Sequence, residues 1–284
     1  MHHDRLSWWD ATGAVSAQVE SGGHWGCPRQ TIKYRTAVLP FMNAVRRLDF
    51  GHEDRKRIYE YVERHGSVAP STVQQRLGID PGGFRHHVAI LRRDGRLETI
   101  EGKLRVVVEA GEAEEHRSDD LAFSIRPARQ EDLSGIVGAI RQVVAERTYI
   151  EAESVAQEVD HQEALLRHNE LESRVFFVAT IGDEVVGWVH LHAPELEKLS
   201  HTAELTVGVL AEYRGNGIGS HLLSRGLEWA SSNEYERIYQ SVPATNEDAI
   251  EFLEHHGWTI EAVRENHYRI DDTYVDEVML AVDL

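Results

Sequence analysis

Cysteine, lysine and long apolar runs are all scarce in this sequence of 284 residues. The single cysteine, Cys27, excludes a disulfide within the chain and is typical of proteins from a reducing compartment. No apolar run approaches the roughly 18 residues that a membrane-spanning helix needs, and the opening MHHDRLSWWD lacks a signal-peptide pattern. We therefore expect a cytoplasmic protein without a membrane partner.

The four lysines (Lys33, Lys56, Lys103 and Lys198) belong to a chain with a net charge of −18. Residues 109–284 carry 13 basic and 36 acidic side chains, whereas residues 1–108 have a small positive excess. This composition resembles that of cytoplasmic proteins from salt-loving microbes, in which salt screens the self-repulsion of a carboxylate-rich surface. An ordinary acidic enzyme is the alternative interpretation.

The first 41 residues show no clear period of 2 or 3.6, so we expect an irregular N-terminal segment. Met42 opens a stretch that has the composition of a folded domain. One hypothesis is that translation starts at Met42 and that residues 1–41 are an artefact of the assigned start.

Residues 42–108 predict three short helices followed by a β-hairpin. The apolar spacing of EDRKRIYEYVERHG, APSTVQQRLGI and DPGGFRHHVAILRRDG is helical, and RLETIEGKLRVVVE alternates around Glu101-Gly102. Such an arrangement is a winged helix-turn-helix, and FRHHVAILRRDG and EGKLRV resemble archaeal winged-helix regulators. In this fold the third helix enters the DNA major groove. DNA is therefore a candidate partner, with a protein-docking module and a solvated arginine-rich face as alternatives. The candidate DNA-contacting cations are Arg85, His86, Arg92, Arg93 and Lys103.

The stretch EAGEAEEHRSDD is acidic and nearly free of large apolar groups, so residues 109–121 are expected to be a linker. Residues 122–284 then predict a second domain. Strands are expected at FSIRPA, RVFFVATI, EVVGWVHLHA, AELTVGVL, RIYQSVPA and two closing segments, and helices at EDLSGIVGAIRQVVAER, SVAQEVDHQEALLRH and NEDAIEFLEHHG. Consecutive hairpins followed by strand-helix-strand indicate an α/β (α+β) fold, a mixed sheet flanked by helices.

The glycine-rich stretch YRGNGIGS, residues 213–220, precedes another helical pattern. Bare backbone N–H groups and the positive end of a helix dipole converge at such a turn, which is typical of phosphate binding. A P-loop is excluded because no lysine follows, and a dinucleotide fingerprint is excluded because Ser220 stands at its third glycine. A flexible turn before a helix is the alternative.

The strand AELTVGVL, the motif RGNGIG and the segment NEDAIEFLEHHGW, in this order, resemble the GNAT superfamily of acetyl-CoA-dependent N-acetyltransferases. The resemblance covers roughly residues 123–284 and implies acetyl-CoA as co-substrate and a primary amine as acceptor. It also implies that the strand before the glycine turn separates from its neighbour. The acceptor itself is not specified, because the loops at 146–170 and 192–203 follow no transferable pattern.

The same resemblance assigns roles to residues. Glu204 is the expected general base, acting directly or through water, although a solvent-facing glutamate is the alternative. The backbone N–H of Val209, or of a neighbour, is the expected oxyanion donor. The expected contacts to coenzyme A are Val207, Val209, Arg214, Gly215, Asn216, Gly217, Ile218, Gly219, Ser220 and Asn246.

One position departs from the family pattern. Where many members carry a tyrosine that protonates the leaving thiolate, this chain has Leu253. Thiolate can leave without an obligatory acid because a thiol has a pKa near 8.5. The missing tyrosine also leaves a second hypothesis open, in which the protein is a transcription regulator that senses acetyl-CoA without turnover. No metal site is expected, since the pairs His86-His87, His190/His192 and His255-His256 lack a third ligand at zinc-like spacing.

Overall fold

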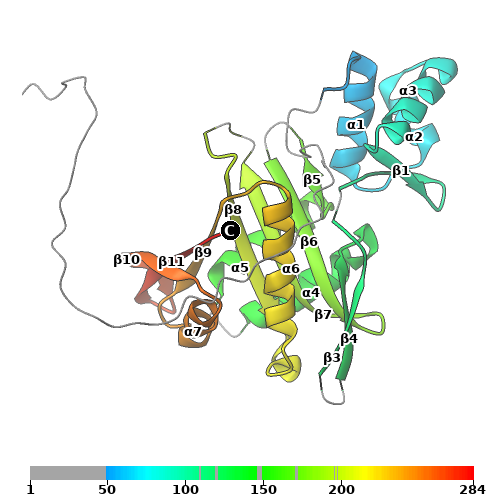
Figure 1. Cartoon of the computed structure of the whole chain (residues 1–284). Coiled ribbons are helices and arrows are strands. Elements are labelled where there is room, and N and C mark those ends of the chain that lie inside the picture. Colours follow the sequence, from blue (N-terminus) through cyan, green and yellow to red (C-terminus); the bar gives the residue numbers. More distant parts are fainter. Residues whose placement is uncertain are drawn as a thin grey trace, which may run out of the picture. The chain divides into compact units, whose positions relative to one another are not determined.

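The computed structural model describes residues 49–108, 110–118, 121–145, 149–169, 172–194, 196 and 198–284 (Figure 1). The described residues fall within one unit, Met42–Leu284. The irregular segment predicted for residues 1–41 and the alternative start at Met42 lie outside the described residues.

The first described part contains α1 (Glu53–His65), α2 (Pro70–Leu77), α3 (Pro81–Arg93) and a hairpin of β1 (Leu97–Ile100) and β2 (Lys103–Val106). These elements lie where the sequence places them. The turn between the two strands has positive φ at both Glu101 (49°) and Gly102 (76°), as a tight hairpin turn needs. The carboxylate of Asp80 accepts hydrogen bonds from the N–H groups of Gly82 and Gly83 and so caps α3.

The core of this part comes from all five elements and includes Ile58, Val62, Val73, Phe84, Leu91, Leu97 and Leu104. One expected position differs. The apolar spacing of EDRKRIYEYVERHG predicts that Tyr61 faces inward with Ile58 and Val62, but Tyr61 is half-buried, whereas Tyr59 is buried and donates a hydrogen bond to the carbonyl of His168 (2.9 Å). The reason is tertiary, because α1 packs against a segment far along the chain as well as against its own neighbours.

A mixed sheet forms the larger part of the described chain. Its strands follow the spatial order β10, β11, β9, β8, β7, β6, β4, β3, and β5 pairs with β6; only the β8–β9 pair is parallel. The strands are β3 (Glu114–Ser118), β4 (Leu121–Pro127), β5 (Arg167–His168), β6 (Glu172–Ile181), β7 (Glu184–Pro194), β8 (Thr202–Val209), β9 (Arg237–Pro243), β10 (Thr259–Ile270) and β11 (Thr273–Asp283).

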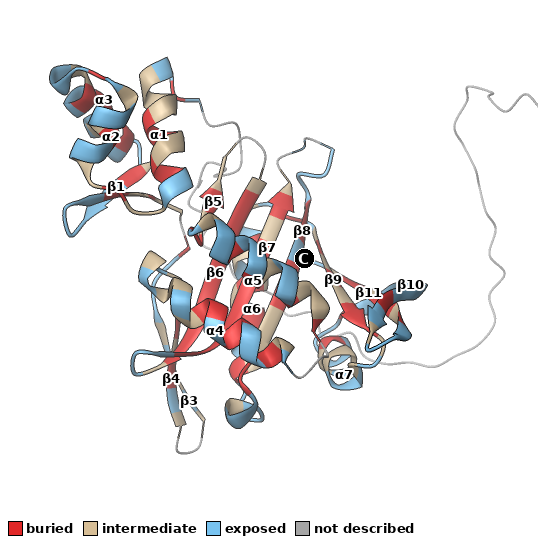
Figure 2. Ribbon diagram, turned by 180° about the vertical axis from the view of Figure 1, so that it is seen from behind, coloured by how far each residue is buried: buried red, intermediate tan, exposed pale blue. Residues whose placement is uncertain are grey.

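Helices cover both faces of this sheet, as the sequence predicts. The 3-10 turn η1 (Gln130–Asp132) leads into α4 (Leu133–Val144), which lies with α5 (Ile150–Gln162) on one face. The other face carries α6 (Ile218–Ser232) and α7 (Glu247–His255), and a second 3-10 turn, η2 (Ala211–Tyr213), follows β8. Figure 2 shows how the buried residues concentrate along the central strands between these layers. None of the described helices is long and apolar enough to cross a membrane.

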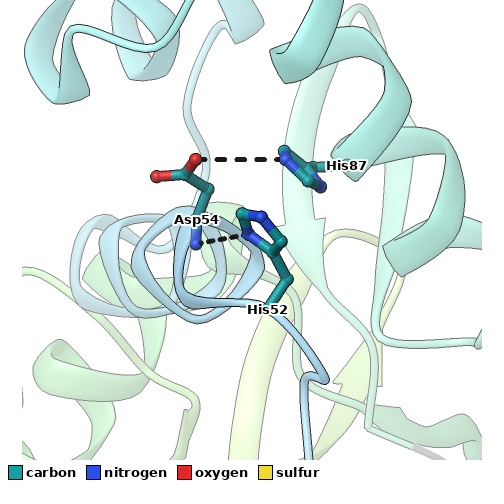
Figure 3. Close-up of side chains that lie close together, drawn as sticks. All are labelled: His52, Asp54 and His87. Atoms are coloured by element: carbon teal, nitrogen blue, oxygen red, sulfur yellow. Dashed lines mark hydrogen bonds and ion pairs between the residues drawn. The ribbon is translucent and has the colours of Figure 1, made fainter.

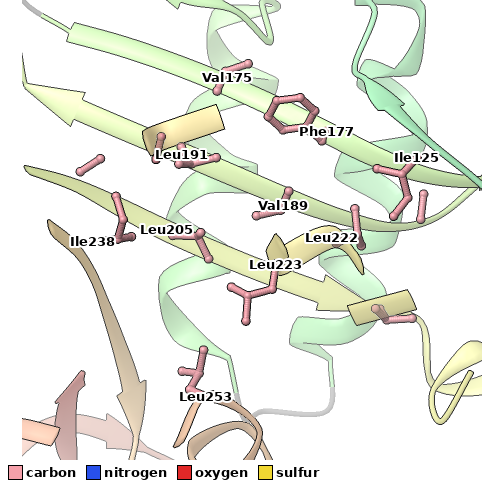
Figure 4. Close-up of a cluster of buried hydrophobic side chains, with 14 of the residues drawn as sticks. Ile125, Val175, Phe177, Val189, Leu191, Leu205, Leu222, Leu223, Ile238 and Leu253 are labelled. Atoms are coloured by element: carbon pink, nitrogen blue, oxygen red, sulfur yellow. The ribbon is translucent and has the colours of Figure 1, made fainter. Parts of the chain in front are cut away.

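The alternation of side chains along β6 produces two separate cores. Phe177 joins the cluster on the α6 face with Leu222 and Leu223, which Figure 4 shows, whereas Phe176 joins the cluster under α4 and α5. Because both faces of β6 are covered, its residues from Ser173 to Thr180 are all buried.

The acidic stretch expected to be a linker is partly a strand, so that prediction is wrong for residues 114–118. β3 pairs with β4 in antiparallel register, with His116 opposite Phe123. Arg225 of α6 forms an ion pair with Glu114 and donates a hydrogen bond to the carbonyl of Ala110 (2.6 Å). Composition alone suggested a solvated segment because the cation that neutralises it lies more than 100 residues away.

The second expected helix of this domain is also displaced. It begins at Ile150, earlier than predicted, and ends at Gln162, after which Arg167 and His168 pair with β6. The guanidinium of Arg167 lies 3.4 Å from the carboxylate of Glu63 in α1, and both side chains are buried. Asn169 donates a further hydrogen bond to Glu63 (3.0 Å). This buried polar contact explains why the chain leaves the helix before its apolar pattern ends.

Candidate active site

The parallel strands β8 and β9 separate after a short stretch of pairing. Only Thr202–Glu204 pair with Arg237–Tyr239, although β8 continues to Val209 and β9 to Pro243. On its other side β8 stays paired with β7 as far as Val209. The second half of β8 therefore presents backbone groups to a gap in the sheet, as the family resemblance implies.

A cavity of about 780 Å³ occupies this gap and extends to the glycine turn. It brings together residues from α4, the start of α5, β8, the turn, β9 and α7. All the residues predicted to contact coenzyme A line this cavity except Asn216. The amide of Asn216 instead donates hydrogen bonds to the carbonyls of Tyr213 (3.1 Å) and Arg214 (3.2 Å) and so holds the turn in shape. The described residues that line it are Val143, Tyr149, Val207, Gly208, Val209, Tyr213, Arg214, Gly215, Gly217, Ile218, Gly219, Ser220, Gln240, Thr245, Asn246, Glu247, Asp248, Ala249, Phe252 and Leu253.

The glycine turn has the conformation of an anion-binding loop. Gly215 and Gly217 have φ values of 79° and 77°, in the left-handed region that disfavours residues with a Cβ atom. α6 begins at Ile218, with no acidic residue in its first turn. The first N–H groups of a helix have no partner within that helix, and the helix dipole adds partial positive charge there. The arrangement thus suits a phosphate or diphosphate.

Two side chains anchor the ends of this site. Arg214 donates from Nε to the carbonyl of Val209 (2.9 Å), which ties the turn to the end of β8. Asn246 caps α7 by accepting a hydrogen bond from the N–H of Ala249 (3.3 Å). The capping role accounts for an asparagine at this position, and its proposed contact to coenzyme A stays a prediction.

The backbone of β8 is engaged within the cavity by residues that the sequence did not single out. The N–H of Val207 donates to the hydroxyl of Tyr149 (2.9 Å), and the side-chain amide of Gln240 donates to the same hydroxyl (2.7 Å). Strand N–H groups two residues apart point to the same side, so the N–H of Val209 also faces the gap. Tyr149 and Gln240 belong to no motif in the sequence, and no local pattern could have identified them.

Glu204 lies at the point where the two strands separate. It is exposed and is the last residue of β8 to pair with β9, opposite Tyr239. Glu204 does not line the cavity. Glu204 and Val207 are three positions apart, a distance of roughly 10 Å along the strand. The position therefore favours proton transfer through water over direct contact, and the role of general base stays a prediction.

The histidines on β7 lie beside Glu204, and the pKa values of their rings are shifted in opposite directions. Burial lowers the pKa of His190 well below its usual value, so this ring is neutral near pH 7. A hydrogen bond with the carboxylate of Glu172 raises the pKa of His192, and the same contact lowers the pKa of Glu172 (3.3 Å between the groups). The two rings therefore form part of the sheet face next to Glu204, and the pKa of His192 is shifted in the opposite direction to that of His190.

Leu253 is buried in the wall of the cavity, where the family tyrosine would stand. It offers no proton to a leaving group. Tyr213 also lines the cavity, but the Glu184 carboxylate lies close enough to raise the pKa of its hydroxyl. Tyr239 and Ser241 of β9 do not line the cavity.

One group of potential metal ligands lies in the three-helix part (Figure 3). The ligand atoms of His52, Asp54 and His87 lie within 4.8 Å of one another. However, Nδ1 of His52 accepts a hydrogen bond from the N–H of Asp54 (3.1 Å) and caps α1. This bond requires the neutral ring to carry its proton on Nε2, so in this arrangement neither ring nitrogen has a lone pair left for a metal. The geometry thus favours helix capping.

The five candidate DNA-contacting residues are all exposed. Four of them, Arg85, His86, Arg92 and Arg93, lie on α3, and Lys103 lies at the start of β2. Arg105, another cation of the β1–β2 hairpin, forms an ion pair with Glu131. DNA contact stays a prediction.

Comparison with known proteins supports the family resemblance for the central part of the chain. Residues 140–258 match the model of the acetyltransferase (GNAT) family. Mycothiol acetyltransferase of Corynebacterium glutamicum (strain R) is 33% identical over 81 residues, which are 28% of this chain and 26% of that protein. N-alpha-acetyltransferase 50 of Danio rerio is 30% identical over 93 residues, which are 32% of this chain and 55% of that protein. The chain thus spans only about a quarter to a half of these relatives.

A solved acetyltransferase of the GNAT family from Streptococcus pneumoniae superposes with a TM-score of 0.48 at 20% identity, covering 57% of this chain and 99% of that one. The family match supports a GNAT-like domain that includes residues 140–258. Acetyl-CoA is the co-substrate of this family.

Proposed function

We propose that this protein is an N-acetyltransferase that moves the acetyl group of acetyl-CoA to a primary amine by direct attack in a ternary complex. The observation that carries the proposal is the cavity between β8 and β9, which joins a glycine turn suited to a diphosphate to a strand edge that is not paired with β9 beyond Glu204. A phosphate site and a strand edge in one cavity match the two ends of the coenzyme A arm.

Each part of the cavity has a role in this proposal. The N–H groups from Arg214 to Ser220 hold the diphosphate, and the edge of β8 holds the amide-containing arm. Only a neutral amine attacks a thioester, so Glu204 takes the amine proton through water. With Leu253 in place of the family tyrosine, the sulfur departs as thiolate and takes a proton from solvent.

The acidic side chains of this part of the chain indicate the charge of the acceptor but not its identity. Glu204 is exposed where β8 and β9 separate, and residues 109–284 carry 36 acidic against 13 basic side chains. These groups favour a cationic acceptor such as a protein lysine, a protein N-terminus or a small polyamine.

A thiol-release assay with acetyl-CoA and a panel of amines tests the proposal. Turnover that depends on both substrates supports it, and calorimetry with coenzyme A tests binding separately. Tight binding of acetyl-CoA without turnover on any amine would instead support the regulator hypothesis. No binding of coenzyme A would contradict both.

We also propose that the three-helix part contacts DNA, because α3 presents four exposed basic side chains on one element. Phosphate contacts make binding fall steeply with salt. The test is a titration of the full chain with duplex DNA at two salt concentrations. If the Arg92→Ala/Arg93→Ala variant binds duplex as the parent does, the face is a docking or solvated surface.

A further inference from the structure

The hydroxyl of Tyr149 lies in the gap between β8 and β9. Tyr149 directly precedes α5 and is 5% exposed, so its ring is fixed by packing on the α4 and α5 face. Its oxygen accepts two hydrogen bonds, from the Val207 N–H (2.9 Å) and from the Gln240 amide (2.7 Å). One donor comes from each of the two strands that separate, so the hydroxyl bridges the opening.

The two accepted hydrogen bonds determine the direction of the Tyr149 hydroxyl proton. A phenol oxygen has two lone pairs and one proton, and here the two donors occupy the lone pairs. The proton is therefore left to point into the cavity that Tyr149 lines. Burial also raises the pKa of this hydroxyl above its ordinary value of 10.0, so the group stays protonated throughout the working pH range.

Hydrogen bonds accepted by a hydroxyl strengthen the one that it donates, since each bond in a chain polarises the next. The Val207 N–H lies on the strand edge where the resemblance puts the oxyanion donor. In this structure the Val207 N–H donates to the Tyr149 hydroxyl. It therefore polarises that hydroxyl, which in turn can donate a stronger hydrogen bond to a group bound in the cavity. The other phenol hydroxyl among the described residues of the cavity wall, on Tyr213, lies beside the carboxylate of Glu184.

We propose that the Tyr149 hydroxyl donates a hydrogen bond to the thioester oxygen of bound acetyl-CoA and stabilises the oxyanion formed during transfer. The inference rests on the proposed function and names a residue that supports it. The amine nitrogen bonds to the thioester carbon, and the carbonyl electron pair moves onto oxygen. The Tyr149 hydroxyl donates its hydrogen bond to that negatively charged oxygen. When that pair returns, the carbon–sulfur bond breaks and its electrons leave on sulfur. The amine proton passes to Glu204 through water, the thiolate is protonated by solvent, and Tyr149 keeps its proton.

A spectroscopic experiment tests this contact without any need for an acceptor. A hydrogen bond to the thioester oxygen lowers the carbonyl stretching frequency of acetyl-CoA, and carbon-13 labelling separates this band from the protein amides. In the parent protein we expect a lowered band on binding, and in Tyr149→Phe we expect it to return towards its position in an apolar solvent. An unchanged band in Tyr149→Phe would overturn the proposal.

Kinetics gives a second, independent measurement. Loss of one oxyanion donor typically costs about 100-fold to 1,000-fold in kcat, and we expect Tyr149→Phe to fall in this range with little change in KM. A large rise in KM with unchanged kcat would assign Tyr149 to binding and overturn the proposal.

Tyr59→Phe is the matched control, because Tyr59 is also buried and its hydroxyl also makes one 2.9 Å hydrogen bond, but far from the cavity. It should keep both the band and kcat, and thermal unfolding of both variants reports any loss of folding. If acetyl-CoA does not bind the parent protein at all, the proposed function fails. If acetyl-CoA binds but its carbonyl band is the same in the parent and in Tyr149→Phe, only the role of Tyr149 fails.

Discussion

Glu204 of β8 and Tyr239 of β9 are the last pair before these two parallel strands separate. Their position fixes where the sheet opens, and it puts the candidate base at the apex of the gap. The carboxylate is exposed at this apex, so water and an incoming amine both have access to it.

We expect Glu204→Gln to lower kcat about 100-fold or more, the usual contribution of a positioned general base. Affinity for coenzyme A should not change, because Glu204 lies outside the cavity wall. Steady-state thiol release and calorimetry measure the two quantities. Glu228→Gln removes another exposed carboxylate, on α6, and serves as the control. Equal kcat for Glu204→Gln and the parent would rule out the assigned base.

We expect Gly217→Ala to weaken coenzyme A binding at least tenfold. Its φ of 77° disfavours any residue with a Cβ atom, so the substitution strains the turn by about 1 kcal/mol or more and displaces its N–H groups. Gly95→Ala is the matched control, since Gly95 has a similar φ of 67° and open space around it. It should lose similar stability yet bind coenzyme A normally. Unaltered binding by Gly217→Ala would contradict the role of the turn.

The contact between His192 and Glu172 predicts a pH-dependent contribution to stability. The folded pKa of His192 is raised, so its contribution is complete below the ordinary value of 6.5 and is lost as pH rises through the raised value. The folded pKa of Glu172 is lowered, so its contribution is complete above 4.5 and is lost as pH falls through the lowered value.

The free energy of unfolding should therefore differ most between the parent and His192→Gln at pH values between 4.5 and 6.5. Urea unfolding across a pH series measures this difference. His161→Gln, on the exposed side of α5, is the control and should show no such maximum. A difference that stays constant from pH 4 to pH 9 would show that the ion pair does not form.

The buried pair of Glu63 and Arg167 predicts strong coupling between α1 and β5. Removing one partner leaves a buried charge, which typically costs about 3 to 5 kcal/mol. Glu63→Gln and Arg167→Met should each destabilise the protein, and the double variant should lose much less than the two losses added together. Chemical unfolding of all four proteins closes the cycle. Additive losses would mean that the two side chains do not interact.

Local patterns account for most of what could be predicted from the sequence. The helices follow from apolar periodicity, and the turn at Gly215 and Gly217 follows from a conformation that only glycine adopts easily. The separation of β8 from β9 came from the family resemblance, because no residue in AELTVGVL signals it. Tyr149 and Gln240 were missed because they meet only in the folded chain, from elements 91 residues apart. β3 was missed because its neutralising partner, Arg225, is equally remote in sequence.

The gap in the sheet also connects its two sides. Val143 belongs to the core under α4 and α5, and Leu253 belongs to the core under α6 and α7, yet both line the same cavity. Acetyl-CoA bound at the turn and an amine bound near Glu204 would therefore come into contact in the gap, each entering from a different side of the sheet. Neither would block the route of the other, so we expect the order of binding and of product release to be set by affinity and not by access.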